Sequence, residues 1–171
     1  MERLGRPNAA VPRLADVPRG DRVETVLVVG VFDLFHAGHV ALLRRARALG
    51  DRLVVVVNGD ALTASYKRPP ITNEEDRRAV LAACRYVDHV EVSNSYSIRD
   101  VVEREGVTQI VHGDDWELDS YKRQIRCDDA FLDAHGVRLV LLPYTEGVST
   151  SEIIRTCAAQ AGATAEPTGG R

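Results

Sequence analysis

Two histidines and a glycine form the strongest chemical signal in the sequence. His36 and His39 flank Gly38 in the segment His-Ala-Gly-His, between a Val-rich run and an amphipathic stretch. The segment is therefore expected where a strand ends and a helix begins. Free backbone N–H groups and the positive end of the helix dipole favour anions there, and a glycine lets the backbone approach a ligand. Since imidazole donates hydrogen bonds, the spacing predicts that both histidines face one phosphate chain; a pair of capping or surface histidines is the alternative.

The usual glycine-rich phosphate loops are absent from this sequence. The turn after the first Val-rich run contains no Gly-x-Gly-x-x-Gly, and the chain has no Gly-x-x-x-x-Gly-Lys-Ser/Thr. Those patterns mark dinucleotide-binding and P-loop sites, respectively. The sequence therefore predicts a different way of holding phosphate at a strand-to-helix turn.

The composition of the 171 residues excludes several classes of function. The net charge is −3, so the chain is a poor binder of nucleic acid or of an anionic membrane, and cations that hold an anion must be gathered locally. The longest apolar runs, Val26–Val29 and Leu53–Val57, are too short to span a bilayer, and the N-terminus lacks the apolar centre of a secretory signal. We expect a cytoplasmic protein. The cysteines are widely spaced and expected to be reduced thiols: Cys84, Cys127 and Cys157.

Apolar runs alternate with helical patterns between residues 24 and 157, which we take as one domain. Strands are predicted at Thr25–Val31, Leu53–Val57, Val87–Val92, Thr108–His112 and Val137–Leu142. Helices are predicted at Val40–Leu49, from a Thr72-x-x-Glu75 capping box through Cys84, at Ser97–Glu105, at Asp119–His135 and after a Ser149-x-x-Glu152 capping box. This order predicts an α/β fold with a five-stranded, mostly parallel sheet and helices on both faces. Residues 1–23 and 158–171 are expected to be a flexible leader and a disordered tail.

Four blocks of the chain resemble the cytidylyltransferase-like nucleotidyltransferases. The resemblance runs from Val26 to Arg155, and its first block admits adenylyl- and cytidylyltransferases alike. The last two blocks are more similar to glycerol-3-phosphate and ethanolamine-phosphate cytidylyltransferases. The blocks are Gly30–His39, Tyr66–Pro70 with Glu75–Arg78, His112–Trp116 and Thr145–Thr150. The resemblance implies a single Rossmann-like nucleotidyltransferase domain, commonly a homodimer, that takes CTP and a small phosphorylated or phosphonate acceptor.

The implied reaction is an in-line displacement at the α-phosphorus of CTP, which needs positioning and charge stabilisation rather than a protein nucleophile. Mg²⁺ is expected to arrive with the CTP phosphates, and no metal-binding residues are expected. The resemblance assigns catalysis to His36, His39 and Lys67, and acceptor binding to Lys67, Arg77 and Tyr96. It assigns nucleotide binding to Gly30, Val31, Phe32, Asp33, Gly38, Gly113, Asp114, Thr145, Gly147, Ser149 and Thr150.

Plainer roles remain open for several of these residues. Lys67 could be a solvated loop lysine, Arg77 a partner in a salt bridge on a helix surface, and Tyr96 a loop aromatic that covers the core. Asp33 could hold a loop as well as orient the metal-bound triphosphate. The Thr145–Thr150 block could simply cap a helix.

The chain also departs from the family pattern at two positions. Tyr144 stands where related enzymes carry an arginine before Thr-Glu-Gly, and Val31 replaces a frequent threonine. The departure at Tyr144 keeps open an adenylyltransferase that acts on a sugar phosphate. A nucleotide-binding module without turnover is a third reading. The acceptor stays open among ethanolamine phosphate, glycerol 3-phosphate, choline phosphate and a hydroxyalkyl phosphonate.

Overall fold

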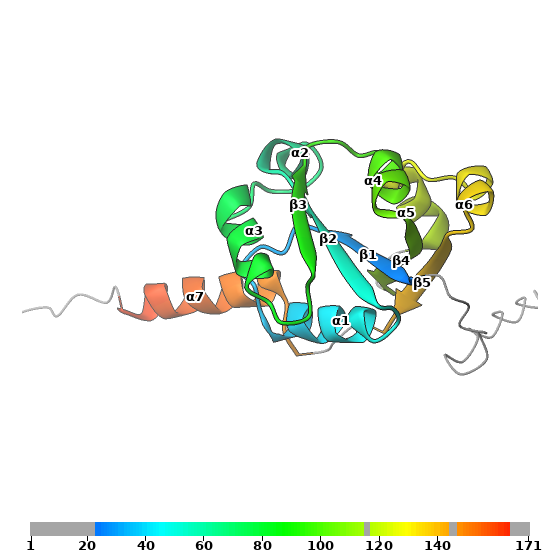
Figure 1. The fold of residues 1–171 in the computed structure, drawn as a ribbon. Coiled ribbons are helices and arrows are strands. Elements are labelled where there is room, and N and C mark those ends of the chain that lie inside the picture. Colours follow the sequence, from blue (N-terminus) through cyan, green and yellow to red (C-terminus); the bar gives the residue numbers. More distant parts are fainter. Residues whose placement is uncertain (1–22, 115–116, 144–146, 165–171) are drawn as a thin grey trace, which may run out of the picture.

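The strands of the protein form one parallel sheet in the computed structural model, which describes residues 23–114, 117–143 and 147–164. The sheet order is β3-β2-β1-β4-β5 and every neighbouring pair is parallel. The predicted α/β class and five-stranded sheet are therefore confirmed (Figure 1). The elements in chain order are β1 (Thr25–Gly30), α1 (Ala37–Arg47), β2 (Arg52–Asn58), α2 (Asp60–Ala64), α3 (Glu74–Ala82), β3 (His89–Ser93), α4 (Arg99–Glu105), β4 (Val107–Gly113), α5 (Leu118–Ile125), α6 (Asp129–His135), β5 (Arg138–Leu142) and α7 (Thr150–Thr164).

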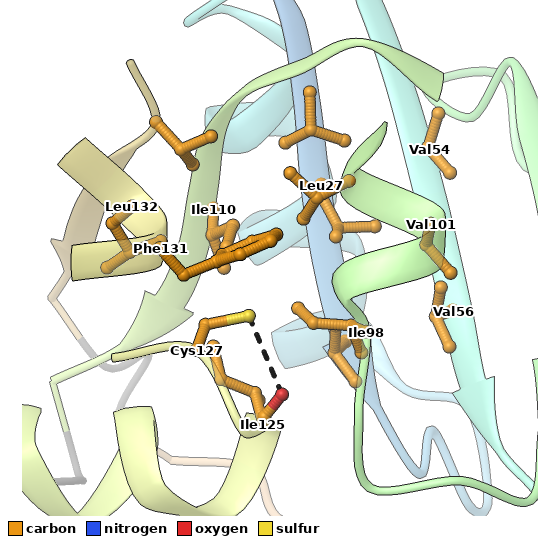
Figure 2. Close-up of a cluster of buried hydrophobic side chains, with 14 of the residues drawn as sticks. Leu27, Val54, Val56, Ile98, Val101, Ile110, Ile125, Cys127, Phe131 and Leu132 are labelled. Atoms are coloured by element: carbon orange, nitrogen blue, oxygen red, sulfur yellow. Dashed lines mark hydrogen bonds between the residues drawn. The ribbon is translucent and has the colours of Figure 1, made fainter. Parts of the chain in front are cut away.

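The central strands are buried on both faces, which explains why they read as continuous apolar runs. Alternate side chains of β1 and β2 point to opposite faces of the sheet. One face packs against α4, α5 and α6. Figure 2 shows this cluster, in which the Cys127 thiol donates to the carbonyl oxygen of Ile125 at 3.6 Å. The other face packs against α1 and α3 through Leu43, Ala46 and Leu81.

The strand order places a switch point between β1 and β4. The chain moves outward from β1 through β2 to β3, then returns to the other side of β1 with β4 and β5. The loops that leave β1 and β4 therefore diverge at the carboxyl edge of the sheet. Ligands of open α/β sheets bind at such a point, so the fold prepares a site after Gly30 and Gly113.

Several helices differ from the predictions in their number, bounds or caps. The predicted helix Asp119–His135 is two helices, because Arg126 adopts a left-handed conformation with φ of 58° and Asp128 caps the second helix. Helix α3 is capped by Asn73, whose side chain accepts from the backbone of Asp76, and not by Thr72. Helix α2 was not predicted, since five residues carry too little periodicity.

The last helix, α7, extends into the predicted tail. It runs through Thr164, so residues 158–164 are helical and not disordered. Figure 1 shows this helix projecting away from the sheet, and most of its described side chains are exposed. The predicted leader, apart from Val23, and the rest of the tail lie outside the described residues. In the part of the chain that the structure describes, no helix is both long and apolar enough to cross a membrane.

Candidate active site

The two motif histidines cap helix α1 and stack on each other. His36 is the N-cap, and its Nδ1 accepts from the backbone N–H of Gly38 at 3.2 Å. His39 Nδ1 accepts from the backbone N–H of His36 at 3.4 Å, which completes a capping box. The two rings lie 3.8 Å apart between centroids. Since both Nδ1 atoms accept, each neutral ring carries its proton on Nε2 and can donate it to a ligand.

Aromatic neighbours fix the orientation of His39 and keep it neutral. Phe32 meets its ring edge-on at 5.2 Å and Phe35 stacks on it at 5.6 Å. Burial lowers the pKa of His39 to about 3, with a further contribution from His36 and an opposing one from Asp33. Burial also lowers the pKa of His36. Without a bound anion, the pair therefore offers two neutral N–H donors rather than two positive charges.

The turn between β1 and α1 is held in an unusual backbone conformation. Phe32 and Leu34 have φ angles of 56° and 47°, in the left-handed region that side chains with a Cβ adopt rarely. Such strain persists where surrounding contacts hold it, and it is common at functional sites. Gly38 is also closely packed, because a Cβ there would lie 3.0 Å from the His36 ring and 3.2 Å from Val148.

Asp33 fastens the segment that carries Lys67 to this turn. Its carboxylate accepts from the backbone N–H groups of Ile71 and Thr72, from the Thr72 hydroxyl and from Arg68 Nη2, at 2.9 to 3.1 Å. Burial alone would raise the pKa of Asp33, but these hydrogen bonds outweigh it and lower the pKa to about 2. The structure therefore gives Asp33 the loop-holding role.

The start of α7 closes the other side of the turn. The Ser149 hydroxyl accepts from the backbone of Glu152 at 3.1 Å, as the predicted capping box requires. The Thr150 hydroxyl donates to the carbonyl oxygen of Asp33 at 2.9 Å. The amino ends of α1 and α7 are thus joined through Asp33, and both bring backbone N–H groups to one region.

Two adjoining cavities lie at the carboxyl edge of the sheet. The larger, about 340 Å³, is lined by both histidines, Gly38 and the start of α7; we call it the nucleotide cavity, after the role expected from the sequence. The smaller, about 140 Å³, opens beside it; we call it the acceptor pocket, again after its expected role. The two share Val29, Gly30, Val31, Lys67 and His112. Lys67 therefore stands where the two cavities meet.

Most of the predicted site residues come together here. The nucleotide cavity is lined by ten of them: Gly30, Val31, Phe32, His36, Gly38, His39, Lys67, Gly113, Ser149 and Thr150. Tyr96 lines the acceptor pocket. Asp114 and Gly147 are exposed and absent from both walls, while Thr145 and Tyr144 lie outside the described residues. The cavities assign no catalytic role by themselves, so the roles of these residues stay predictions.

Arg77 takes a different place from the expected one. Its side chain is 1% exposed, and Nη1 donates to the carbonyl oxygens of Val31 and Asn58, just after β1 and at the end of β2. Its Nε donates to the carbonyl oxygen of Thr72 at 3.0 Å, and Nη2 pairs with Asp60 at 2.6 Å. This corrects both expectations for Arg77, because its donors are used inside the fold and it forms no wall of either cavity.

Several wall residues were not predicted. Asn58 and Tyr66 line the acceptor pocket, and Asn58 Nδ2 donates to the Tyr66 hydroxyl at 2.8 Å. His112 lines both cavities, and its ring lies 4.1 Å from that of Tyr121. Gln124 reaches the pocket from α5. One signal was available for Asn58, since a polar residue that ends a buried strand beside the switch point faces the ligand edge.

The described walls of the nucleotide cavity offer few ligands for a magnesium ion. Mg²⁺ prefers carboxylate oxygens, and the described walls of the nucleotide cavity contain none. The motif carboxylate of Asp33 already accepts hydrogen bonds from four donor groups. That Mg²⁺ arrives with the phosphates of a nucleotide stays a prediction.

Comparison with known proteins agrees with the fold and the motif. The model of the family described as cytidylyltransferase-like matches residues 27–156. The chain is 39% identical to an FAD synthase of Pyrococcus horikoshii over 78% of the chain and 92% of that protein. It is 35% identical to the glycerol-3-phosphate cytidylyltransferase of Bacillus subtilis over 77% of the chain and 95% of that protein.

Two further matches are more limited, the first in the share of the relative that is covered and the second in sequence identity. The ethanolamine-phosphate cytidylyltransferase of Arabidopsis thaliana is 40% identical over 61% of the chain, which spans only 26% of that protein. The crystal structure of a lipopolysaccharide core biosynthesis protein from Thermoplasma volcanium superimposes with a TM-score of 0.60 at 25% identity, covering 74% of this chain and 100% of that one. With a parallel sheet, a histidine-capped first helix and a matching family model over most of its length, the chain belongs to the cytidylyltransferase-like nucleotidyltransferases.

Proposed function

We propose that the protein transfers CMP from CTP to a small phosphorylated or phosphonate acceptor and releases pyrophosphate. The observation that carries the proposal is the pair of adjoining cavities with Lys67 at their junction. One cavity has the histidine pair and two helix amino ends, which suit a triphosphate. The other is small and opens next to it, which suits a compact acceptor.

In this proposal the reaction is a single displacement at the α-phosphorus. An anionic oxygen of the acceptor attacks, a new P–O bond forms, and the bond to the bridging oxygen of the β-phosphate breaks. The electron pair of that bond leaves with pyrophosphate. Since the attacking oxygen is already anionic, no protein base is needed, and catalysis depends on alignment and charge stabilisation.

The side chains divide that work by their chemistry. His36 and His39 donate from Nε2 to phosphate oxygens, and such preorganised donors stabilise charge that grows in the transition state. Lys67 contacts the α-phosphate from one side and the acceptor phosphate from the other, because it lines both cavities. The strap from Arg68 to Thr72, fixed by Asp33, holds the lysine's backbone in place.

An adenine nucleotide is the second candidate for the donor. The chain spans 92% of a relative named FAD synthase at 39% identity, and the name denotes a product that contains adenine. Relatives named as cytidylyltransferases match at similar identity, 35% and 40%. The donor therefore has to be decided by assay.

Pyrophosphate release with CTP and with ATP, each with magnesium, tests the proposal across a panel of small phosphates and phosphonates. We expect turnover with CTP, and we expect it to fall at least about 100-fold in His39→Ala, the usual cost of losing one transition-state donor. Turnover with ATP alone would transfer the proposal to the second candidate. Tight CTP binding with no turnover on any acceptor would instead favour a nucleotide-binding module. A homodimer stays a prediction, which sedimentation would check.

A further inference from the structure

The acceptor pocket is small and lacks negative charge. Its volume, about 140 Å³, is less than half that of the nucleotide cavity. Among the described residues that line it, none is an aspartate or a glutamate, and Lys67 is the one formally charged side chain. The rest of its polar wall consists of His112 and of uncharged side chains: Asn58, Tyr66, Ser95, Tyr96, Tyr121 and Gln124.

A second positive group lies close to this wall. The guanidinium of Arg126 sits over the ring of Tyr96, 5.9 Å from the centroid. The hydroxyl of the same tyrosine is 2.8 Å from the Ser65 hydroxyl, which fixes the ring on the pocket side. A cationic acceptor tail that entered here would meet Lys67 on the wall, with Arg126 behind Tyr96, and no carboxylate among the described lining residues. Like charges at short range oppose binding, and this effect discriminates between ligands of equal shape.

The tyrosine rings on the pocket wall do not offset the repulsion of a cationic tail. An aromatic cage binds an ammonium group through open ring faces. Here the Tyr96 ring already interacts with Arg126, and the Tyr121 ring lies 4.1 Å from that of His112. Tyr66 meets Tyr96 at 6.0 Å with the ring planes tilted by 50°, and its hydroxyl accepts from Asn58. The three rings therefore already contact groups of the protein, and they offer a ligand hydroxyl groups as well as ring faces.

We infer that the acceptor is a short phosphate or phosphonate whose tail is uncharged and carries a hydroxyl, and that ammonium-bearing acceptors are disfavoured. The inference rests on the proposed function and names its substrate class. Asn58 and Gln124 are the specificity determinants, because a primary amide both donates to and accepts from a hydroxyl. Lys67 takes the anionic end of the acceptor, and the neutral wall takes the tail.

A matched pair of substrates tests the inference. 2-Hydroxyethyl phosphate and 2-aminoethyl phosphate have the same number of heavy atoms and differ only in a hydroxyl against an ammonium group. We expect kcat/KM for pyrophosphate release to favour the hydroxyl compound by about tenfold or more, since each 1.4 kcal/mol of repulsion gives a factor of 10. Equal values, or a preference for the amine, would overturn the inference.

Variants then test whether the charge of the pocket causes the preference. Gln124→Glu adds a carboxylate of the same shape and should shift the ratio toward the amine by about tenfold. Ser95→Asp, on an exposed loop of the same pocket, should act in the same direction and guards against a folding defect in the first variant. The control Gln160→Glu, exposed on α7, should leave the ratio unchanged. An unchanged ratio in both pocket variants would also overturn the inference.

The outcomes separate this inference from the proposed function. If neither compound of the pair is used but another phosphorylated acceptor with a charged or bulky tail gives pyrophosphate, the inference fails and the proposed function stands. If no acceptor gives pyrophosphate with CTP or with ATP, both fail.

Discussion

Replacing Asp33 with asparagine tests whether one buried carboxylate holds both the fold and the lysine in place. The Asp33 side chain is 5% exposed, and its carboxylate accepts hydrogen bonds from Arg68, Ile71 and Thr72. A pKa that falls from 3.8 to about 2 corresponds to about 2 kcal/mol of stability at neutral pH. Solvent screening of the exposed Arg68 reduces this figure. We therefore expect Asp33→Asn to lower the free energy of unfolding by about 1 to 2 kcal/mol at pH 7.

The difference in stability between wild type and Asp33→Asn should become smaller at low pH. Because the pKa of Asp33 is lowered in the folded protein, its stabilisation is fully present above pH 3.8 and is lost as the pH falls through 2. Urea denaturation followed by circular dichroism at pH 7, 5 and 3 would measure this. The gap between wild type and Asp33→Asn should be equal at pH 7 and 5 and narrower at pH 3. Both proteins keep the histidines, so most of the histidine contribution to the pH dependence cancels.

A second readout of the same variant concerns Lys67. Loosening the strap from Arg68 to Thr72 should lower kcat/KM for pyrophosphate release by about tenfold or more, because small displacements of a reacting group are costly. The matched control is Asp51→Asn, which removes an exposed carboxylate that accepts from one backbone N–H, that of Glu24, at 2.9 Å. That control should change neither stability nor turnover to this extent. If Asp33→Asn unfolds at the same urea concentration as wild type and keeps its turnover, the reasoning is refuted.

Four further changes have definite expected outcomes. His39→Ala should lower turnover at least about 100-fold while costing less than about 2 kcal/mol in urea denaturation, and near-normal turnover would contradict its role. Gly38→Ala should weaken CTP binding in calorimetry, because its Cβ would press on the His36 ring at 3.0 Å, whereas Gly162→Ala meets open space and should have no effect. Arg77→Leu should cost about 3 to 5 kcal/mol of stability, because it removes a donor from three carbonyl oxygens inside the fold, those of Val31, Asn58 and Thr72, and where it folds the acceptor KM should stay within about twofold. Chelating magnesium should abolish turnover, since the described walls offer the triphosphate few positive charges; full turnover in excess chelator would disprove this.

The sheet could be predicted because burial on both faces leaves a strong mark in the sequence. The runs Thr25–Gly30 and Arg52–Asn58 are nearly continuous in valine and leucine, and each ends in a glycine or a polar residue. The break within residues 119–135 could not be predicted, because it lies at Arg126, an arginine in a conformation usually taken by glycine. The helical extension to Thr164 was not predicted, because the glycines, the threonines and Pro167 of residues 158–171 favour a tail, while the alanines, which favour helix, decide the structure.

The site was predictable only where its residues are close in sequence. His36 and His39 belong to one turn, so their spacing alone indicates that they meet. The acceptor pocket joins Asn58 at the end of a strand, Tyr96 in a loop and Gln124 in a helix, and no local pattern connects them. Arg77 shows a second limit of prediction from sequence. Nothing in a helical sequence distinguishes an arginine that donates to carbonyl oxygens inside the fold from one that faces a phosphate.

The corrected place of Arg77 changes how a chain of net charge −3 can accept polyanions. The sequence predicted a local cluster of cations, yet Arg77 is used inside the fold and both histidines have lowered pKa values. What the described site offers is a set of neutral N–H donors, the amino ends of two helices and the charge of Lys67. Neutral donors stabilise charge that develops at a fixed position without attracting every anion, because their interaction falls off with distance faster than that of a cation. In the proposed reaction the single lysine, at the junction of the two cavities, neutralises the charge that develops during transfer.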